Sequence, residues 1–378
     1  MKLLVLGAES QLGTALTRVL QGQGVDHAVL ATDELDLLKQ MDLLKKVTRA
    51  GCTQVINVTS SVNLVQAQND PDAASKLDIT NTRGMSALAE VCKHLDLPLL
   101  HHSSSYVFDG QKVHPYAEAD ETNPICRYGQ SKWYGERAIR EALPSHVILR
   151  TDWMFSKERN KYFRDHIEDC KQSQGKIAVM SNRLSPTPAN DVARVLLAIA
   201  RQVDCAADVW GTYHYCALQP MSHDHFVENF LQEAARYDPA LAEVINKLQI
   251  TKIPVHLPYI PNSALNCQRI FETFGIKQRS RAGELSLLLQ DIYGIQPVEP
   301  EVLTQEVEPE FGRLANTKQV RKQLRDQSRD QNKDGQAAAS NSVKKNKSKA
   351  QAKNQLRKTK DSNPPAQTDA TRKGSQQP

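Results

Sequence analysis

The sequence has little of what marks disulfide-rich, metal-binding or membrane-spanning proteins. Its seven cysteines are odd in number, widely spaced and never arranged as C-x-x-C, so neither a disulfide framework nor a zinc site is indicated. This cysteine usage fits a reducing compartment, and we expect a cytoplasmic protein. No stretch approaches the roughly 20 apolar residues that a membrane span needs, and we expect no contact with a membrane. The opening run, MKLLVLGAES, is too short for the apolar part of a signal peptide and instead predicts a buried strand.

Aromatic residues are almost missing from the last part of the chain, which is strongly basic. Residues 312–378 hold 17 Lys and Arg against 5 Asp and Glu, about +12, which leaves the first 311 residues at about −7. Such a segment buries too little apolar surface to offset its chain entropy. We expect a globular domain over 1–295, an acidic linker at 296–311 and a disordered basic tail at 312–378. The tail either contacts nucleic acid or an acidic partner through its charge, or is a neutral, solubilising extension.

The first apolar run is followed by a glycine turn and a helical pattern, as at the opening of a dinucleotide-binding unit. In GAESQLG, Gly7 would make the tight turn and Gly13 would let the helix pack closely on the strand, with the helix N-terminus facing a pyrophosphate. Ser10 stands where a third glycine is usual, and it puts a side chain where the backbone would approach the phosphate. An ordinary strand, turn and helix is the alternative. The candidate cofactor-binding residues here are Gly7, Ser10, Gln11, Leu12 and Gly13.

Two acidic residues follow the second predicted strand, at 27–31. Asp33 and Asp36 are placed to accept hydrogen bonds from an adenosine ribose and to disfavour a 2′-phosphate, which favours NADH over NADPH. The alternative is that one of them only caps the next helix.

Further apolar runs alternate with helical patterns along the first 150 residues. We predict strands at 53–57, 97–101 and 146–150, with one long helix from 71 to 91 between the first two. This alternation predicts an α/β fold with a parallel, doubly wound sheet, in which ligands bind beyond the carboxyl ends of the strands. Four polar or glycine positions fall at that edge: Gly7, Asn57, Ser104 and Arg150.

The stretch from Ser103 to Lys132 holds a candidate carbonyl-reducing site. Tyr128 and Lys132 are four residues apart, so on a helix they lie on one face. An ammonium group beside a phenol lowers its pKa toward the working range, and the Ser104 hydroxyl would hold the substrate carbonyl. Alone, Y-x-x-x-K is a weak pattern, because about one chance match is expected in a chain with ten tyrosines. A solvated helix face is the alternative.

Motifs in a fixed order run through residues 1–295. They are GAESQLG at 7–13, DELDL at 33–37, VIN at 55–57, TNTRG at 80–84, SSSYVFDG at 103–110, PYAEAD at 115–120, YGQSKWYGE at 128–136, LRTDW at 149–153, NRLSPTPANDVA at 182–193, GTYHYCA at 211–217 and LPYIPNSALN at 257–266. In them the chain resembles the extended short-chain dehydrogenases/reductases of the dTDP-4-dehydrorhamnose reductase (RmlD-like) family.

The resemblance implies a Rossmann-like core over about 1–155 and a smaller, discontinuous substrate-binding lobe mostly within 156–295. It implies reduction of a 4-keto nucleotide-sugar by NADH or NADPH, and a homodimer is the assembly expected. The matching catalytic residues are Ser104, Tyr128 and Lys132, the last also holding the nicotinamide ribose. The matching substrate-side residues are Ser104, Tyr106, Trp153, Pro186, Thr187 and Asp191. Trp153 as plain core and Pro186 as a plain turn are the alternatives.

Some positions depart from the family pattern. Ser105 stands where aspartate is usual, and Ser61, Val62 and Val65 replace the usual tyrosine, threonine and aspartate after Asn57. No acidic cluster matches the family's bridging magnesium, so no metal is expected. These departures support an alternative, a non-catalytic binding subunit resembling the regulatory beta subunit of methionine adenosyltransferase.

Overall fold

The computed structural model describes residues 1–34, 37–59 and 64–295. The chain divides into two units, Met1–Val298 and Glu299–Pro378, and everything described here belongs to the first. The expectations for Asp36, Ser61, Val62 and residues 296–378 therefore lie outside the described residues. Within the described ranges, no helix is long and apolar enough to cross a membrane.

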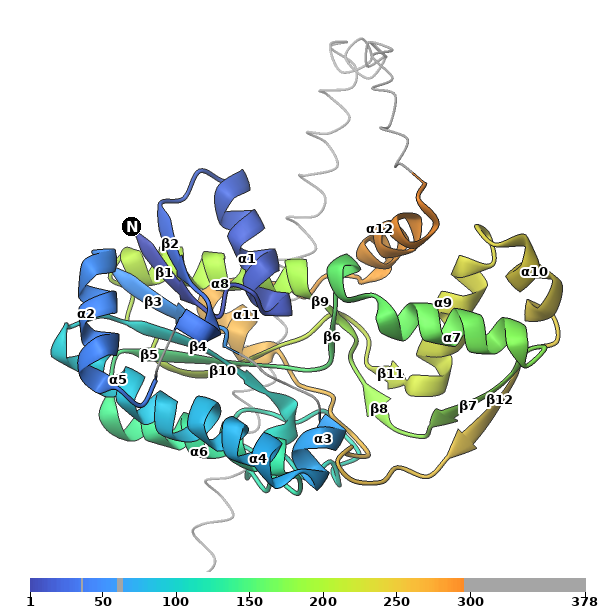
Figure 1. Cartoon of the computed structure of the whole chain (residues 1–378), viewed down its shortest axis with the longest axis horizontal. Helices are drawn as coiled ribbons and strands as arrows, with labels where there is room; N and C mark the ends of the chain where they lie inside the picture. Colours follow the sequence, from blue (N-terminus) through green and yellow to red (C-terminus); the bar gives the residue numbers. More distant parts are fainter. Residues whose placement is uncertain (35–36, 60–63, 296–378) are drawn as a thin grey trace, which may run out of the picture. The chain divides into compact units, whose positions relative to one another are not determined.

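A six-stranded, fully parallel sheet forms the centre of the fold (Figure 1). Its strands, in spatial order, are β10 (Gly211–Tyr215), β5 (His146–Thr151), β4 (Leu99–Ser104), β3 (Gln54–Asn57), β1 (Leu3–Leu6) and β2 (His27–Leu30). The five strands predicted from sequence are all present. Four of them are buried at every position, which explains why they read as continuous apolar runs. The parallel, doubly wound α/β prediction is confirmed.

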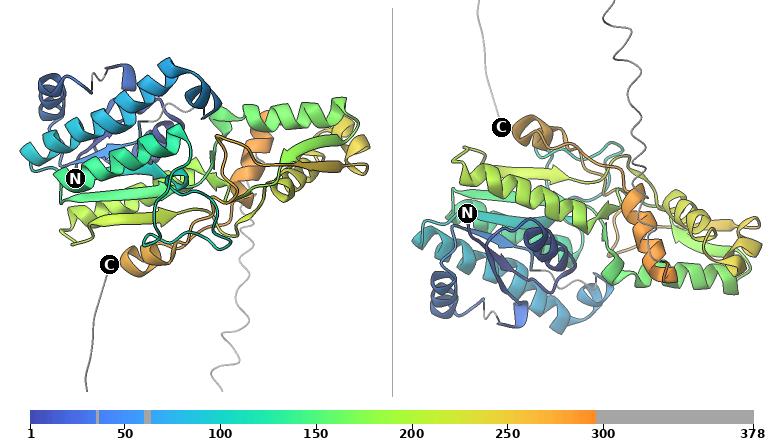
Figure 2. Two further views of the ribbon diagram at one scale, coloured as in Figure 1. Left: turned by 90° about the horizontal axis from the view of Figure 1, so that it is seen from below. Right: turned by 90° about the horizontal axis from the view of Figure 1, so that it is seen from above.

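Helices cover both faces of the sheet (Figures 1 and 2). On one face α1 (Gln11–Gly22) and α8 (Ala189–Asp204) pack into the larger hydrophobic cluster. On the other face lie α2 (Gln40–Ala50), α5 (Gly84–His94) and α6 (Arg127–Ala142), with a second cluster beneath them.

The predicted long helix at 71–91 is interrupted. After the short helix α3 (Leu64–Asn69), α4 (Pro71–Asp78) runs into a π-helical turn at Ile79–Arg83 before α5 begins. An added Cβ at Gly84 would come within 2.7 Å of Ile79 O and the Leu37 side chain. This crowding accompanies the π-turn, which sequence periodicity alone does not reveal.

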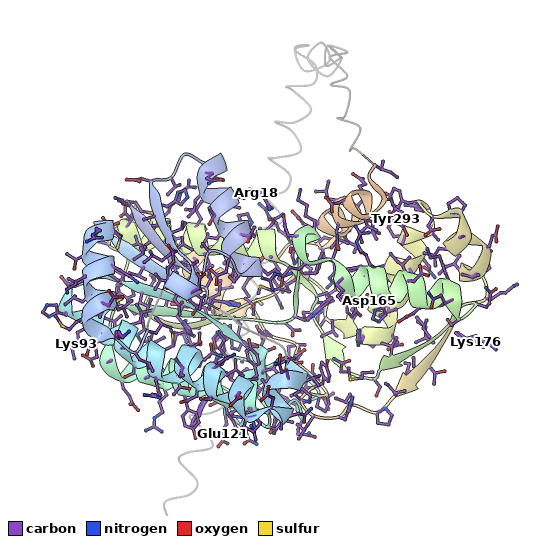
Figure 3. The ribbon with its side chains drawn as sticks, in the orientation of Figure 1. Arg18, Lys93, Glu121, Asp165, Lys176 and Tyr293 are labelled. Atoms are coloured by element: carbon purple, nitrogen blue, oxygen red, sulfur yellow. The ribbon has the colours of Figure 1, made fainter. Side chains whose placement is uncertain are left out.

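A separate lobe has its own hydrophobic cluster, built around Phe163, Phe226 and Phe230. Its elements are α7 (Lys161–Gln172), α9 (His223–Ala234), α10 (Pro239–Ile245), α12 (Ala282–Tyr293) and the parallel pair β7 (Lys176–Met180) and β12 (Gln249–Ile253). Figure 3 labels Asp165, Lys176 and Tyr293 on this lobe.

The lobe is discontinuous because the chain leaves it and returns to the core. Helix α8, strand β10 and helix α11 (Gln268–Phe274) contribute to the core cluster although they follow residue 155. Two short strand pairs accompany these crossings: β6 (Met154–Phe155) with β9 (Thr187–Pro188), and β8 (Arg183–Leu184) with β11 (Met221–Ser222).

The turn between β1 and α1 has no room for side chains at its two glycines. Gly7 has φ +83°, and a Cβ there would lie 2.6 Å from the Thr59 backbone. A Cβ on Gly13 would lie 2.1 Å from Gly7 O. The tight turn and the close helix-to-strand packing expected from sequence are thus both present.

We expect Gly13→Ala to lower the free energy of unfolding by about 1–3 kcal/mol or more, because backbone atoms must move to admit the methyl group. Gly22→Ala in the same helix is the control, since nothing lies within 4 Å of its added Cβ; it should be neutral or stabilising by up to about 1 kcal/mol. Urea unfolding of both variants makes the comparison. Equal stabilities would contradict the close packing of α1 on β1.

Candidate active site

Ser10 begins helix α1 without disturbing its N-terminus. Its hydroxyl accepts a hydrogen bond from Gly13 N at 3.0 Å and donates one to Val58 O at 2.9 Å. The side chain is buried and serves as a helix cap, so it does not stand in front of the helix as the sequence suggested. Gln11 donates to Ser156 Oγ at 3.2 Å, and Leu12 is part of the core. Because these side chains are engaged within the protein, the backbone N–H groups are the atoms that could bind a phosphate here.

The acidic group after β2 is exposed and partly ordered by hydrogen bonds. Asp33 lies in a 3₁₀ turn, Thr32–Glu34. The Thr32 hydroxyl donates to the Glu9 carboxylate, and Glu34 accepts from Ala31 N at 2.7 Å. Helix α2 begins only at Gln40, seven residues after Asp33, and its N-cap residue is Lys39. The alternative that Asp33 caps this helix is therefore wrong. Glu9 and Glu34 therefore belong to the acidic group at the end of β2, to which the sequence assigned only Asp33 and Asp36.

The Asn57 side chain is engaged within the protein. Its Oδ1 accepts from Thr59 N at 3.1 Å and Thr59 Oγ1 at 2.8 Å, and its Nδ2 lies 3.0 Å from His101 Nδ1. It fixes the turn after β3. Arg150, which sequence reasoning placed at the ligand edge, directs its guanidinium into a buried ion pair with Glu136, at 2.8 and 2.6 Å. That pairing removes Arg150 from the candidate ligand contacts.

The structure brings Ser104, Tyr128 and Lys132 together. Ser104 is the last residue of β4; Tyr128 and Lys132 are one turn apart in the first half of α6. All three are buried, and the Ser104 hydroxyl lies near enough to the Tyr128 phenol to lower its pKa in part. The approach depends on Gly129, where an added Cβ would lie 2.0 Å from Tyr106 O. Sequence reasoning missed this glycine, although the motif YGQSK contains it.

Burial controls the protonation of the pair on α6. It raises the pKa of Tyr128 to about 12, and the nearby Ser104 hydroxyl only partly opposes this. Burial also lowers the pKa of Lys132 to about 8, with the Glu136 charge acting in the other direction. The expected lowering of the Tyr128 pKa by Lys132 is therefore wrong for this structure, because loss of water penalises the phenolate more than its neighbours stabilise it. At neutral pH the phenol carries its proton. The Lys132 ammonium donates to His102 O at 3.2 Å.

The predicted substrate-side residues fall into two groups. Tyr106 is close to the catalytic groups: its ring meets that of Tyr128 edge-on at 5.8 Å, and its N–H donates to Ser104 Oγ at 3.3 Å. Trp153 instead packs in the aromatic cluster of the lobe, 4.8 Å from Tyr162.

The S-P-T-x-x-x-D segment is held by internal bonds. Pro186 O accepts from Arg281 at 3.0 Å. The buried Thr187 hydroxyl bonds Ser185 O at 2.7 Å and Ala217 N at 3.1 Å. Asp191 pairs with Arg194 at 2.9 Å. These bonds fix the course of the segment, and contact of Pro186 and Thr187 with a substrate stays a prediction.

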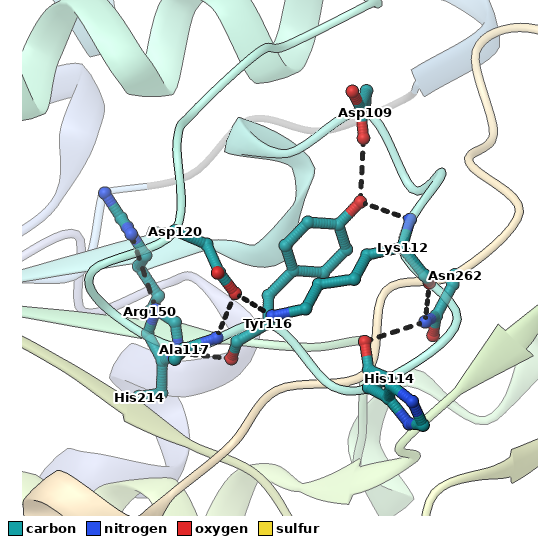
Figure 4. Close-up of polar contacts among 9 residues, drawn as sticks. All are labelled: Asp109, Lys112, His114, Tyr116, Ala117, Asp120, Arg150, His214 and Asn262. Atoms are coloured by element: carbon teal, nitrogen blue, oxygen red, sulfur yellow. Dashed lines mark hydrogen bonds and ion pairs between the residues drawn. The ribbon is translucent and has the colours of Figure 1, made fainter.

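Hydrogen bonds to β10 and to the 257–266 motif hold the loop after β4 in place (Figure 4). The Tyr116 hydroxyl donates a hydrogen bond to Asp109 at 2.7 Å, and the Tyr116 carbonyl lies 3.0 Å from His214 Nδ1 on β10. Asn262 donates to Lys112 O at 2.6 Å. These contacts hold the segment next to Ser104 against the core and against the 257–266 motif.

A cavity lined by parts of the core and of the lobe lies away from these groups. About 480 Å³ in volume, it is lined by α1, α8 and α12 residues such as Arg18, Asn190 and Glu284, and by neither Ser104 nor Tyr128. Across the described residues, no three His, Cys, Asp or Glu side chains gather in a way that could hold a metal ion.

Comparison with known proteins identifies the family to which this chain is similar. The family model described as "RmlD substrate binding domain" matches residues 1–293. A dTDP-4-dehydrorhamnose reductase of Aggregatibacter actinomycetemcomitans is 30% identical over 281 residues, 73% of this chain and 94% of that protein. The enzyme of that name from Sinorhizobium fredii is 29% identical, over 73% and 93%.

Solved structures agree on the fold. A dTDP-4-dehydrorhamnose reductase of Clostridium acetobutylicum superposes with a TM-score of 0.65 at 23% identity, covering 77% of this chain and 99% of that one. One of Bacillus anthracis, in complex with NADP, gives 0.63 at 20% identity, covering 76% and 96%. With a family match over 293 of its 378 residues, the chain belongs to the RmlD substrate-binding-domain family of extended short-chain dehydrogenases/reductases.

Proposed function

We propose that this protein is an NAD(P)H-dependent reductase of a 4-keto nucleotide-sugar, with dTDP-4-dehydrorhamnose as the substrate to try first. The observation that carries the proposal is the burial of Ser104, Tyr128 and Lys132 together at the carboxyl end of a Rossmann sheet, with Tyr128 and Lys132 one turn apart on α6. The names of the curated relatives support the substrate class.

The β1–α1 turn fits a dinucleotide. Gly7 makes a tight turn with no room for a side chain against the Thr59 backbone, and α1 presents its N-terminal amides and its positive dipole end there. Residues 7–13 would hold the pyrophosphate and Lys132 the nicotinamide ribose. When bound, a reduced nicotinamide supplies the hydride.

The protein side chains would manage the proton and the developing charge. Tyr128, protonated at neutral pH, donates its proton to the carbonyl oxygen, while Ser104 Oγ hydrogen-bonds the same oxygen. Preorganised donors at a developing oxyanion supply much of the rate in such sites. Lys132, whose pKa is about 8, still carries its charge at neutral pH and stabilises the phenolate left on Tyr128.

We further propose a preference for NADH. Glu9, Asp33 and Glu34 are exposed around the end of β2, and three carboxylates there would repel the 2′-phosphate of NADPH. A cytoplasmic location and a homodimer stay predictions, as does contact of the basic tail with nucleic acid or an acidic partner.

The test is the oxidation of NADH and of NADPH by the full-length protein with dTDP-4-dehydrorhamnose, followed by absorbance. Turnover with a higher kcat/KM for NADH is expected. Turnover only with NADPH would overturn the cofactor preference, and none with any 4-keto nucleotide-sugar would overturn the reductase.

Ser104→Ala should lower kcat by about 10²–10³-fold, since it removes one donor at the developing oxyanion. Ser86→Ala, an exposed position on α5, is the matched control and should leave kcat unchanged. Steady-state rates at saturating substrate give the comparison. A Ser104→Ala enzyme within threefold of the wild type would remove Ser104 from the mechanism.

A further inference from the structure

Asp152 is a buried carboxylate that the catalytic scheme does not use. It follows the last residue of β5 and is 5% exposed. A charged side chain is rarely buried so completely without a partner of opposite charge. Among the described residues no lysine or arginine forms an ion pair with it, and burial raises its pKa to about 6. Its contacts must explain why the carboxylate is there.

Those contacts come from two segments that are far from Asp152 in the sequence. Asp152 accepts hydrogen bonds from the backbone N–H of Ser185 and from the hydroxyl of Ser105. Ser105 directly follows β4, and Ser185 lies between β8 and β9. One side chain thus ties the end of β4 to the segment between β8 and β9.

The bond to Ser105 acts directly beside the proposed catalytic groups. The Ser105 hydroxyl donates to Asp152 Oδ1 at 3.2 Å and is completely buried. Ser105 opens the 3₁₀ turn Ser105–Val107, in which Tyr106 N donates to Ser104 Oγ and the Tyr106 ring meets Tyr128. A shift of this turn would therefore move Ser104 relative to Tyr128, and misplacement by about 1 Å costs reaction rate.

We propose that Asp152 is the positioning residue of this site: its carboxylate, joined to Ser105, replaces the aspartate that the family resemblance places at position 105. The carboxylate reaches Ser105 from the end of β5. It holds the turn that carries Ser104 and Tyr106 at a fixed distance from the Ser185 segment. This inference rests on the proposed reductase function and names a further residue of the same site.

The first variant is Asp152→Asn, which keeps the volume and removes the charge. Its amide NH₂ cannot accept a hydrogen bond, so either Ser105 or Ser185 loses its acceptor. We expect kcat/KM for the keto sugar to fall about 10–100-fold, with affinity for NADH within twofold of the wild type and with an unchanged or higher melting temperature. A purely structural role would instead lower the melting temperature and leave kcat and KM of the folded protein unchanged, and that result would overturn the proposal.

The second variant moves the carboxylate. Asp152→Ser alone should be impaired, and the exchange Ser105→Asp/Asp152→Ser should regain at least tenfold in kcat/KM by restoring one carboxylate between the two positions. An exchange variant no better than Asp152→Ser would also overturn the proposal.

Failure of the proposed function would look different, because the wild type itself would then show no turnover. In that case the affinity of the same variants for dTDP-4-dehydrorhamnose, by calorimetry, decides the role of Asp152. The positioning role is kept if Asp152→Asn and Asp152→Ser each bind about tenfold more weakly and the exchange variant regains the affinity that Asp152→Ser loses. Equal affinities in all four proteins reject it.

Discussion

Replacing Tyr128 with phenylalanine is expected to lower kcat by about 10³-fold, while the affinity for NADH stays within twofold of the wild type. The phenol is the proposed proton donor, and a positioned general acid contributes about 10²–10⁴-fold. Because burial raises the pKa of Tyr128 to about 12, the hydroxyl is protonated in the resting protein and ready to donate. The change removes one oxygen and keeps the ring that packs on Tyr106. Steady-state rates and cofactor fluorescence titration measure the two quantities.

Tyr134→Phe is the matched control on the same helix. Its side chain is 48% exposed and its ring contacts Trp133. Its loss of a hydroxyl should leave kcat unchanged. A Tyr128→Phe protein that keeps more than a tenth of the wild-type kcat would show that another group donates the proton.

The largest expected loss of stability follows from Glu136→Gln. Glu136 is fully buried and binds Arg150 through both carboxylate oxygens; it also accepts from the Ser103 hydroxyl at 2.6 Å. Removing one partner of a buried ion pair leaves the other charge uncompensated and costs about 3–5 kcal/mol. The pair joins α6, which carries Tyr128 and Lys132, to β4 and β5. Urea unfolding at neutral pH should therefore show a much earlier transition.

Glu141→Gln on the same helix is the control. Its carboxylate pairs with Arg137 at 2.7 Å, but both side chains are more than half exposed, so the loss should stay below about 1 kcal/mol. A loss of that size in Glu136→Gln as well would contradict the role of the buried pair.

The pH dependence gives a second readout for Glu136. The nearby Arg150 charge and the hydrogen bonds lower the pKa of Glu136 to about 2, despite its burial. A lowered folded-state pKa stabilises the protein above the ordinary value of 4.5 and loses that contribution as the pH falls toward 2. The stability difference between wild type and Glu136→Gln should therefore shrink over that range.

Much of the core could be predicted because its signals are local. Strand β1 (LLVL) is buried at every position and is uniformly apolar, so it is easily recognised, and β3 (QVIN) keeps an apolar centre. Strand β10 (GTYHY) could not be predicted as a strand from its own residues, because tyrosine, threonine and histidine make its apolar character weak. It is marked in the sequence only as a family motif. The lobe pair β7 and β12 joins residues more than 70 positions apart, which no local pattern reveals.

The candidate site divides in the same way. The spacing of Tyr128 and Lys132 is a property of one helix, and it placed them correctly beside each other. Their pKa values depend on burial by the rest of the protein, which is why the predicted direction for Tyr128 was wrong. The side-chain bond of Ser10 to Val58 and that of Ser105 to Asp152 each join residues more than 40 positions apart. Neither contact was visible before the fold was known.

The most direct measurement of the reductase claim is the transfer of deuterium from the reducing face of labelled NADH or NADPH to dTDP-4-dehydrorhamnose, detected by mass spectrometry of the nucleotide-sugar product. We predict a reduced product one mass unit heavier than that made with unlabelled cofactor, with the label at C4, and no such product with Tyr128→Phe in the same time. Binding of cofactor and nucleotide-sugar by the wild type without any labelled product would contradict the reductase and would favour a non-catalytic binding subunit.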